Sequence, residues 1–243
     1  MNRGDTKNLI FVSDFFIDEV SGGAEFCNEA LMQRLSSYYN IEKRKSRNIL
    51  LGDSLDGFVQ KNKNNFFIIA NFFQLSEPVK KIMQNLQYAI IEHDHKYVST
   101  NNPSLWKDFV APESKIINKQ FYRNARAVLC QSKKHSEILQ KNLLINNIVN
   151  LAGNIWTDGQ LDVLEKNIDV EKKIDFAIMR SANKNKGMPV AIGFCQKNNL
   201  DFHLLEHKPF PEFINELASV KNFVFFPQWF ETYSRICIEA KIV

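Results

Sequence analysis

Long hydrophobic runs, paired cysteines and a large excess of either charge are all missing from this chain of 243 residues. Its apolar runs are far shorter than the ~20 residues that a membrane-spanning helix needs. The first residues do not resemble a signal peptide, so we expect a cytoplasmic protein. Lysine and arginine number 31 against 27 aspartates and glutamates, a net charge of +4. This weak balance gives no argument for nucleic-acid binding, but it suits an anionic ligand or peripheral contact with the inner face of an acidic membrane.

The four cysteines are scattered through apolar stretches, and no two of them form a C-x-x-C pair. They are Cys27, Cys130, Cys195 and Cys237. We interpret them as reduced core thiols, which excludes a disulfide framework and a cysteine-based zinc scaffold. With 44% hydrophobic and 24% charged residues, the composition is that of an ordinary folded protein with a substantial core.

Short apolar runs alternate with helical patterns along the chain, which predicts an α/β fold with parallel sheets. The predicted strands are Asn8–Asp14, Asn48–Leu51, Phe66–Phe73, Gln87–His93, Tyr122–Gln131, Asn147–Leu151, Ile174–Met179, Leu200–Leu205 and Phe223–Phe226. The charge-rich segment Leu161–Lys173 predicts a domain boundary, which we place between residues 165 and 166.

The last stretch carries two glutamates in an E-x7-E arrangement, Glu231 and Glu239, where a strand gives way to a helix. Carboxylates accept hydrogen bonds from hydroxyl groups, which a sugar and a ribose supply in quantity. The stretch resembles the E-x7-E signature of retaining glycosyltransferases of the GT-B fold, family 4. The resemblance implies that Glu231 contacts the transferred sugar and Glu239 the nucleotide ribose, with Ser234 and Arg235 beside the donor. Ser234 replaces the family's usual glycine, and two acids on a solvated helix would give the same pattern.

Paired glycines, Gly22 and Gly23, precede a predicted helix after the first strand. Glycines there allow close backbone approach, and the helix amides form a natural anion site. Together with Glu25 they resemble the G-G-x-E segment of the same family, which implies contact of both glycines with the donor. Glu25 would fix the helix. A turn without a ligand is the alternative.

Polar residues follow the predicted strand Gln87–His93, at the edge where open parallel sheets bind ligands. The resemblance implies that His93 reaches the donor sugar, while Asp94 and His95 help to define the acceptor side. A metal site built from these three residues is one alternative, although the sequence supplies no further histidine or cysteine pattern for the remaining ligands. A purely structural cluster is another.

A cationic loop follows the strand Ile174–Met179 and ends in Lys186-Gly187 before the next helix. Two positive charges and helix amides together suit a diphosphate. Because family 4 enzymes have an arginine and a Lys-Gly pair here, the resemblance assigns the phosphate contacts to Arg180 and Lys186. Earlier in the chain, Ser132 and Lys133 either touch the phosphates or simply cap a helix. A solvated lysine loop is the alternative for Lys186.

These motifs occur in the family's order over most of the chain. The resemblance therefore implies two Rossmann-like GT-B domains: residues 1–165 on the acceptor side, and residues 166–243 as a partial nucleotide-sugar donor domain. The expected activity is sugar transfer with retention, from a nucleotide-diphosphate-sugar to a carbohydrate or glycolipid acceptor in polysaccharide synthesis. His93, Arg180, Lys186 and Glu231 are the expected catalytic residues. No metal or other cofactor is expected, in line with the missing D-x-D motif.

About 70 residues follow Lys173, whereas domains most often have about 100 to 150. We therefore expect a truncated or reduced second domain. Its uncovered sheet edges would favour self-association. The alternative function is that of a non-catalytic or inactive protein that binds a nucleotide-sugar.

Overall fold

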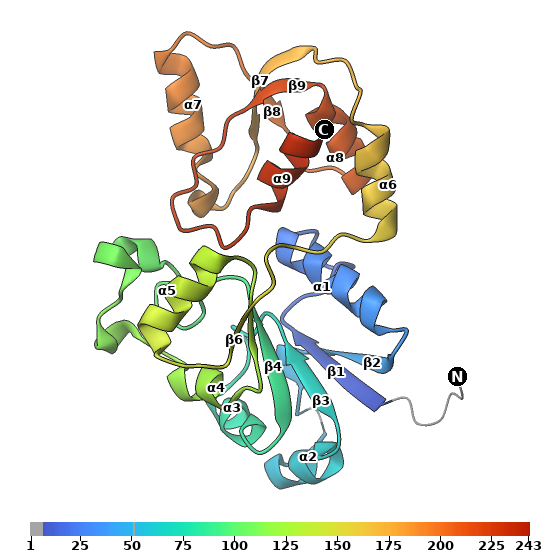
Figure 1. Ribbon diagram of the computed structural model, residues 1–243, viewed down its shortest axis with the longest axis vertical. Coiled ribbons are helices and arrows are strands. Elements are labelled where there is room, and N and C mark those ends of the chain that lie inside the picture. The colour runs from blue at the N-terminus through green and yellow to red at the C-terminus, as the bar shows by residue number, and fades with distance from the viewer. Residues whose placement is uncertain (1–6, 51) are drawn as a thin grey trace. The chain divides into compact units, whose positions relative to one another are not determined.

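The computed structural model describes residues 7–50 and 52–243 (Figure 1). The chain divides into two compact units, and the division falls between Ile155 and Trp156. The predicted boundary at residues 165 and 166 lies further along the chain. The reason is helix α6 (Asp158–Lys166), whose charges gave the segment a linker-like composition. Its buried Leu164 packs in the core of the second unit, so the helix belongs there and not to a linker.

The described strands of unit 1 form a six-stranded parallel sheet in the order β2-β1-β3-β4-β5-β6 (Figure 1). Their bounds are β1 Lys7–Ser13, β2 Tyr39–Lys45, β3 Phe66–Ile69, β4 Gln87–Glu92, β5 Val128–Cys130 and β6 Ile148–Asn150. The central strands β3 and β4 are apolar along nearly their whole length because helices cover both faces of the sheet.

Helix α1 packs on one face of this sheet, against residues such as Phe11 and Ile68. Helices α2 to α5 contribute to the core on the other face, which includes Ile69 and Tyr88. The helices are α1 Gly23–Leu35, α2 Leu55–Asn62, α3 Glu77–Met83, α4 Lys119–Asn124 and α5 Lys133–Leu143, with 3-10 turns η1 Ser46–Asn48, η2 Pro103–Leu105, η3 Lys107–Phe109 and η4 Glu113–Lys115. Residues of the inner strands β1, β3, β4 and β5 thus face two separate cores.

Unit 2 has a parallel three-stranded sheet of described strands in the order β8-β7-β9. The strands are β7 Ile174–Met179, β8 His203–Leu205 and β9 Val220–Phe223; the helices besides α6 are α7 Met188–Lys197, α8 Phe210–Ala218 and α9 Arg235–Ile242, with the 3-10 turn η5 Lys184–Lys186. One core joins α6, α8 and α9 to the sheet, and a second joins α7 to its other face (Figure 1). This is the same layered arrangement as in unit 1.

Several strand predictions are wrong in position or length. Strand β3 ends at Ile69 and not at the predicted Phe73, and β8 begins at His203 and not at the predicted Leu200. The strand predicted at Asn48–Leu51 is absent from the described part of that range, because β2 lies earlier and Asn48 ends a 3-10 turn; Leu51 lies outside the described residues. The strand predicted at Tyr122–Gln131 is mostly helix α4 and a loop, and only β5 is extended. The strand predicted at Phe223–Phe226 begins earlier, since β9 pairs with β7 from Val220.

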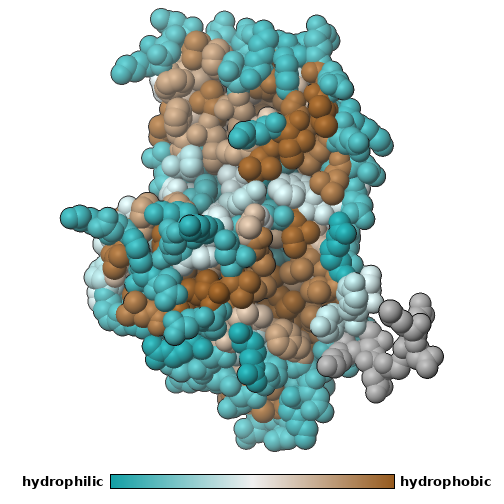
Figure 2. Space-filling view, viewed as in Figure 1, coloured by the Kyte–Doolittle hydropathy of each residue, from teal (hydrophilic) through white to brown (hydrophobic). Residues whose placement is uncertain are grey.

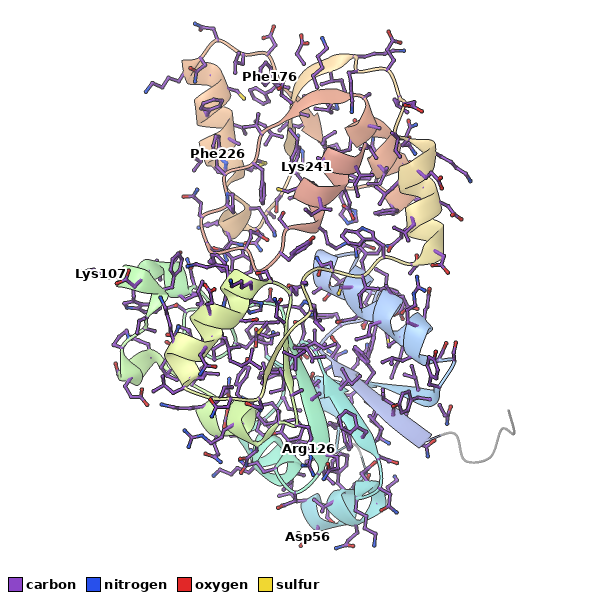
Figure 3. The ribbon with its side chains drawn as sticks, viewed as in Figure 1. Asp56, Lys107, Arg126, Phe176, Phe226 and Lys241 are labelled. Atoms are coloured by element: carbon purple, nitrogen blue, oxygen red, sulfur yellow. The ribbon has the colours of Figure 1, made fainter. Side chains whose placement is uncertain are left out.

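No helix within residues 7–50 and 52–243 combines the length and the apolar character needed to cross a membrane. On the face shown in Figure 2, hydrophobic side chains reach the surface of each unit among hydrophilic ones. In unit 2, the exposed ones include Phe194 of α7 and Phe226, whose rings meet edge to face at 5.3 Å. Figure 3 labels Phe226.

Candidate functional sites at the carboxyl edges of the two sheets

All strands of unit 1 are parallel, so their carboxyl ends lie along one edge of the sheet. The chain leaves β1 toward β2 on one side and later returns to β3 on the other, which makes the point between β1 and β3 the topological switch. Open α/β sheets bind ligands outside the carboxyl ends at this point. Helix α1 is the next element after β1 and follows the loop of residues 14–22, so its first turn belongs to this edge.

The paired glycines form the start of α1, where Gly22 is the N-cap and Gly23 the first residue. Glu25 is buried, and its carboxylate folds back over the start of α1. A Cβ atom on Gly22 would lie only 2.4 Å from Glu25 Oε2, so only a glycine leaves room for the carboxylate there. Asn71 Nδ2 donates a hydrogen bond of 3.1 Å to Glu25 Oε1. Burial raises the pKa of Glu25, and the nearby Asp94 carboxylate raises it further. The glycines therefore make room for an acid of the chain itself.

His93 directly follows β4 and is buried, with Nε2 at 3.0 Å from Asn28 Oδ1. Burial, aided by Lys96, lowers the pKa of His93 to about 3. The imidazole is therefore neutral at physiological pH and can exchange hydrogen bonds, but it supplies no positive charge. Asp94 is half-buried, and its backbone N–H donates to Glu92 Oε1 at 2.9 Å.

A buried ion pair that sequence reasoning missed holds this loop. Lys96 Nζ lies 3.1 Å from Glu92 Oε1, with the two side chains 1% and 0% exposed. The Tyr122 hydroxyl also donates to Glu92, as does the Lys96 backbone N–H. Burial by itself would raise the pKa of Glu92, but Lys96 and the other partners lower it to about 2. The spacing of four residues between Glu92 and Lys96 was the available signal, although it usually marks an exposed helix pair.

The structure separates the two histidines that the metal interpretation joins. The strand ends at Glu92, and His95 has a left-handed backbone (φ 54°), so His93 and His95 do not alternate along one strand face. His95 Nδ1 lies 2.9 Å from the Tyr97 hydroxyl, and its ring packs against His135 at 5.1 Å. Among the residues that the structure describes, no group of three His, Cys, Asp or Glu side chains is placed to hold a metal ion.

In unit 2, the structure brings two of the predicted site residues together. The loops after β7 and β9 meet at the carboxyl edge of the sheet, where Lys186 Nζ lies 2.7 Å from Glu231 Oε1. The same oxygen accepts a hydrogen bond of 2.7 Å from Trp229 Nε1, and Lys186 lies over the Trp229 ring. The predicted phosphate ligand and the predicted sugar ligand are therefore neighbours, although in this state each charge neutralises the other.

Gly187 explains how these two loops can approach so closely. It has a left-handed backbone (φ 67°), and a Cβ atom there would lie 1.8 Å from the Phe226 carbonyl oxygen. The backbone N–H of Gln228 also donates to the Asn185 carbonyl at 2.8 Å. Only glycine fits both the backbone conformation and the contact.

Arg180 points to a different partner from the one that we expected. Its Nε lies 2.6 Å from Glu206 Oε1, which follows β8, and both side chains are about half exposed. Strands β8 and β9 flank β7 on opposite sides. Glu206 comes after β8 and Glu231 after β9, so the two ion pairs use acids from opposite sides of the central strand. The two predicted phosphate ligands are thus each paired with an acid of the chain.

Glu239 is buried in a network with residues from the start of unit 2. Its Oε1 accepts from Trp156 Nε1 at 2.9 Å and from Arg235 Nε at 3.2 Å, and the guanidinium lies 4.6 Å over the Trp156 ring. Ser234 is the N-cap of α9 without a side-chain capping bond. In unit 1, Ser132 caps α5 by accepting from the His135 N–H at 3.1 Å, as the capping alternative predicts.

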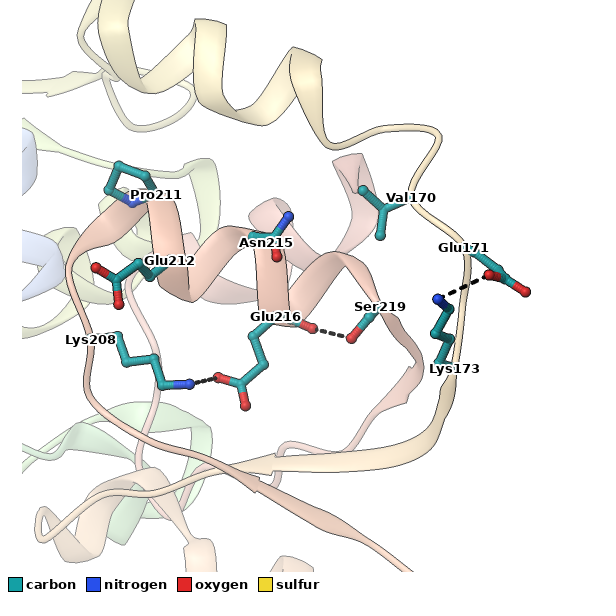
Figure 4. Close-up of a pocket in the computed structure, with 9 residues that line it drawn as sticks. All are labelled: Val170, Glu171, Lys173, Lys208, Pro211, Glu212, Asn215, Glu216 and Ser219. Atoms are coloured by element: carbon teal, nitrogen blue, oxygen red, sulfur yellow. Dashed lines mark hydrogen bonds and ion pairs between the residues drawn. The ribbon is translucent and has the colours of Figure 1, made fainter.

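A separate pocket of about 710 Å³ lies beside α8 in unit 2 (Figure 4). Lysines and glutamates that pair with one another line it, including Lys208–Glu216 at 2.9 Å and Lys173–Glu171 at 3.1 Å. Its lining residues are Val170, Glu171, Lys173, Lys208, Pro211, Glu212, Asn215, Glu216 and Ser219. None of the predicted site residues is among them.

A search against models of known protein families gave no match, and a search of curated proteins gave none either. Among solved structures, the chain is similar to the pneumococcal O-GlcNAc transferase GtfA in complex with UDP and GlcNAc, with a TM-score of 0.50 and 13% sequence identity. This similarity covers 76% of the chain and only 43% of the transferase.

UDP-GlcNAc 2-epimerases are also similar to the chain. For the Methanocaldococcus jannaschii enzyme the TM-score is 0.46 with 10% identity, over 96% of this chain and 75% of that one. For the Neisseria meningitidis enzyme it is 0.43 with 12% identity, over 94% and 74%. The similarity to the transferase and the two parallel sheets confirm the predicted fold class: the chain consists of two Rossmann-like α/β units of the GT-B type.

Proposed function

We propose that the chain binds a nucleotide-diphosphate-sugar and transfers the sugar, with retention of configuration, to a carbohydrate or glycolipid acceptor. One observation carries this proposal: Lys186 and Glu231, from loops far apart in the sequence, meet 2.7 Å apart at the carboxyl edge of a parallel sheet. A cation suits the diphosphate and a carboxylate suits sugar hydroxyls, so the two groups match the two ends of the bond that breaks.

In the proposed reaction, the diphosphate draws Lys186 away from Glu231. Lys186 then stabilises the negative charge that grows on the leaving oxygen, while the freed Glu231 carboxylate positions the sugar. The acceptor hydroxyl oxygen forms the new bond to the anomeric carbon, and its proton leaves with the diphosphate. Arg180, which is paired with the half-exposed Glu206, is the second proposed phosphate ligand.

The remaining predicted ligands take supporting roles in this proposal. Glu239 Oε1 already has donors, so a ribose hydroxyl would bind the other carboxylate oxygen beside Ser234 and Arg235. The neutral His93 would contact the donor sugar. Asp94 would contact the acceptor, and the fully buried His95 would support its loop. We propose that the reaction needs no metal or other cofactor. We also propose that the protein acts in polysaccharide synthesis in the cytoplasm, at the inner face of the membrane.

A thermal-shift experiment tests the donor site. We choose UDP as the first probe because the similar pneumococcal transferase was crystallised with it. UDP should raise the melting temperature of the wild type, and Lys186→Ala should abolish most of this shift. Lys184→Ala is the matched control, since Lys184 is an exposed cation in the same loop and should leave the shift unchanged. Equal shifts in all three proteins would remove the phosphate assignment.

A product assay then separates the proposed enzyme from the alternative, a non-catalytic nucleotide-sugar-binding protein. A transferase releases UDP from a UDP-sugar when an acceptor is present, and Lys186→Ala should reduce that release steeply. Binding of the UDP-sugar without any released UDP, over a panel of sugars and acceptors, would favour the non-catalytic protein.

A further inference from the structure

Four buried side-chain polar atoms of unit 1 have no hydrogen-bond partner in the described part of the chain. One is His135 Nε2 on α5, and the other three lie at the carboxyl edge of the sheet near β1 and β3. Those three are Ser13 Oγ, Asn28 Nδ2 and Asn71 Oδ1, on side chains of residues that are 0%, 2% and 7% exposed. Buried polar atoms are nearly always bonded, because an unpaired one has lost its water without any replacement. Three such atoms in one region call for an explanation.

The three residues belong to one place in the fold, the switch point between β1 and β3. Ser13 ends β1, and Asn71 follows β3 by two residues. The two strand ends are bonded together, since the Ala70 N–H donates to the Val12 carbonyl at 2.9 Å. Asn28 lies on α1, the helix that starts at this edge.

The other ends of the two amides fix their orientation. Asn71 Nδ2 donates to the Glu25 carboxylate, which can only accept when ionised, so the Asn71 oxygen is the unpaired atom. Asn28 Oδ1 lies against His93 Nε2, which leaves the Asn28 nitrogen unpaired. The edge thus offers one acceptor, one donor and one hydroxyl group that can do both.

The charges at this edge disfavour an anionic ligand. Glu25 occupies the space over the first turn of α1, and the carboxylates of Asp14 and Asp94 also lie at the strand ends. The cation nearby, Lys96, is buried against Glu92. The sequence predicts contact of Gly22 and Gly23 with the donor at an anion site. An anionic group there would meet a carboxylate where an anion-binding helix offers free amides.

We propose that the switch point of unit 1 binds an uncharged, hydroxyl-rich group such as a sugar ring, through Ser13, Asn28 and Asn71. A hydroxyl both donates and accepts, so neighbouring hydroxyls of one ring can satisfy an amide nitrogen, an amide oxygen and a serine at once. This proposal rests on the proposed function for the origin of the sugar. Binding at this edge nevertheless needs neither Lys186 nor a phosphate.

Ligand-observed NMR on the full chain tests it with neutral probes, methyl glucoside and N-acetylglucosamine, and with the anions pyrophosphate and UDP. The neutral sugars should bind the wild type and Lys186→Ala equally well. Ser13→Ala and Asn71→Leu should each weaken sugar binding about 10-fold, the loss expected for one hydrogen bond left unmade. Binding of UDP should show the opposite pattern, being lost in Lys186→Ala and kept in Ser13→Ala.

Stability measurements distinguish a ligand site from a structural role. Ser13→Ala removes an unpaired atom and should leave the melting temperature of the free protein unchanged or raise it. The matched control is Ser46→Ala, since the equally buried Ser46 hydroxyl donates to the Asn71 carbonyl at 3.0 Å and its loss should lower the melting temperature.

Each contrary result has its own meaning. A lower melting temperature for Ser13→Ala, no binding of neutral sugars, or sugar binding that Asn71→Leu leaves intact would overturn the sugar site. Pyrophosphate binding that Asn71→Leu abolishes would replace the sugar site with an anion site. Loss of UDP binding alone would refute the donor site in unit 2 and leave the sugar site standing.

Discussion

Glu92 holds the loop of residues 93–97 after β4, because its carboxylate accepts hydrogen bonds from Lys96, Tyr122 and the backbone N–H of Asp94. Glu92→Gln would leave the buried Lys96 ammonium with only the more exposed Asp94 carboxylate, 3.9 Å away, as a counter-charge. We expect this change to lower the free energy of unfolding by about 3 to 5 kcal/mol, as when one partner of a buried pair is removed. Urea unfolding at pH 7, followed by circular dichroism, measures it.

Glu206→Gln is the matched control for this prediction, since it removes the acid from an ion pair that is about half exposed. An exposed pair contributes about 0 to 1 kcal/mol, so this variant should stay close to the wild type. Similar losses of unfolding free energy in both variants would show that the buried Glu92–Lys96 pair matters no more for stability than the exposed Arg180–Glu206 pair.

At the scale of elements, the apolar strands were predictable and the edge strand was not. Strands β1, β3 and β4 each contain an unbroken apolar run that is buried, and β7 has one from Phe176 to Met179, after the exposed Asp175. Strand β2 lies at the sheet edge and is charged, with Lys43 paired to Glu29 of α1, which is why it reads as a loop. Strand β9 is displaced because pairing with β7 fixes its start, which no local pattern reveals.

The site was predictable in part. The order of motifs placed Lys186 and Glu231 in one site, and the structure brings them into contact. The acids that pair with Arg180 and Lys96 depend on tertiary contacts, and the folding back of Glu25 depends on the space that Gly22 leaves. Such contacts are not encoded in a spacing along the chain.

Gly187 ends η5 and packs against the backbone of the loop after β9. Its substitution tests how much this close packing contributes to stability. Gly187→Ala would combine a strained left-handed backbone with a clash against the Phe226 carbonyl. We expect a loss of about 2 kcal/mol or more in the free energy of unfolding. Tryptophan fluorescence during urea unfolding measures it, because Trp156 and Trp229 belong to unit 2.

Gly193→Ala supplies the contrast on the adjacent helix α7. A Cβ atom at Gly193 would meet nothing within 4 Å, so alanine should raise the stability by about 0.5 to 1 kcal/mol. If both substitutions behaved alike, the close approach at Gly187 would not be what holds the two loops together.

For the whole molecule, the buried histidines predict sensitivity to acid. Burial lowers the pKa of His93 and of His135 to about 3, from 6.5 in an unfolded chain. Below pH 6.5 the unfolded state therefore binds more protons, and each histidine removes about 1.4 kcal/mol of stability per pH unit down to about pH 3. Glu92, with its pKa lowered from 4.5 to about 2, adds a further loss as the pH falls below 4.5.

Urea unfolding at several pH values between 7 and 4 measures this dependence. His135→Gln should reduce the slope of stability against pH by about one proton, whatever it does to the stability at pH 7. His207→Gln, at an exposed position, is the control for the replacement of a histidine by glutamine. An unchanged slope in His135→Gln would mean that His135 is already protonated in the folded protein or remains accessible to water.

Strand β2 has a further consequence for how copies of the chain behave at high concentration. It ends the sheet order, so one row of its backbone groups faces no other described strand. Glu42, Lys43, Arg44 and Lys45 follow one another there, and a strand from a second copy would have to desolvate them in order to dock. This edge is therefore a poor template for fibril growth, and a design that grafts unit 1 into a larger fusion should leave those charges in place.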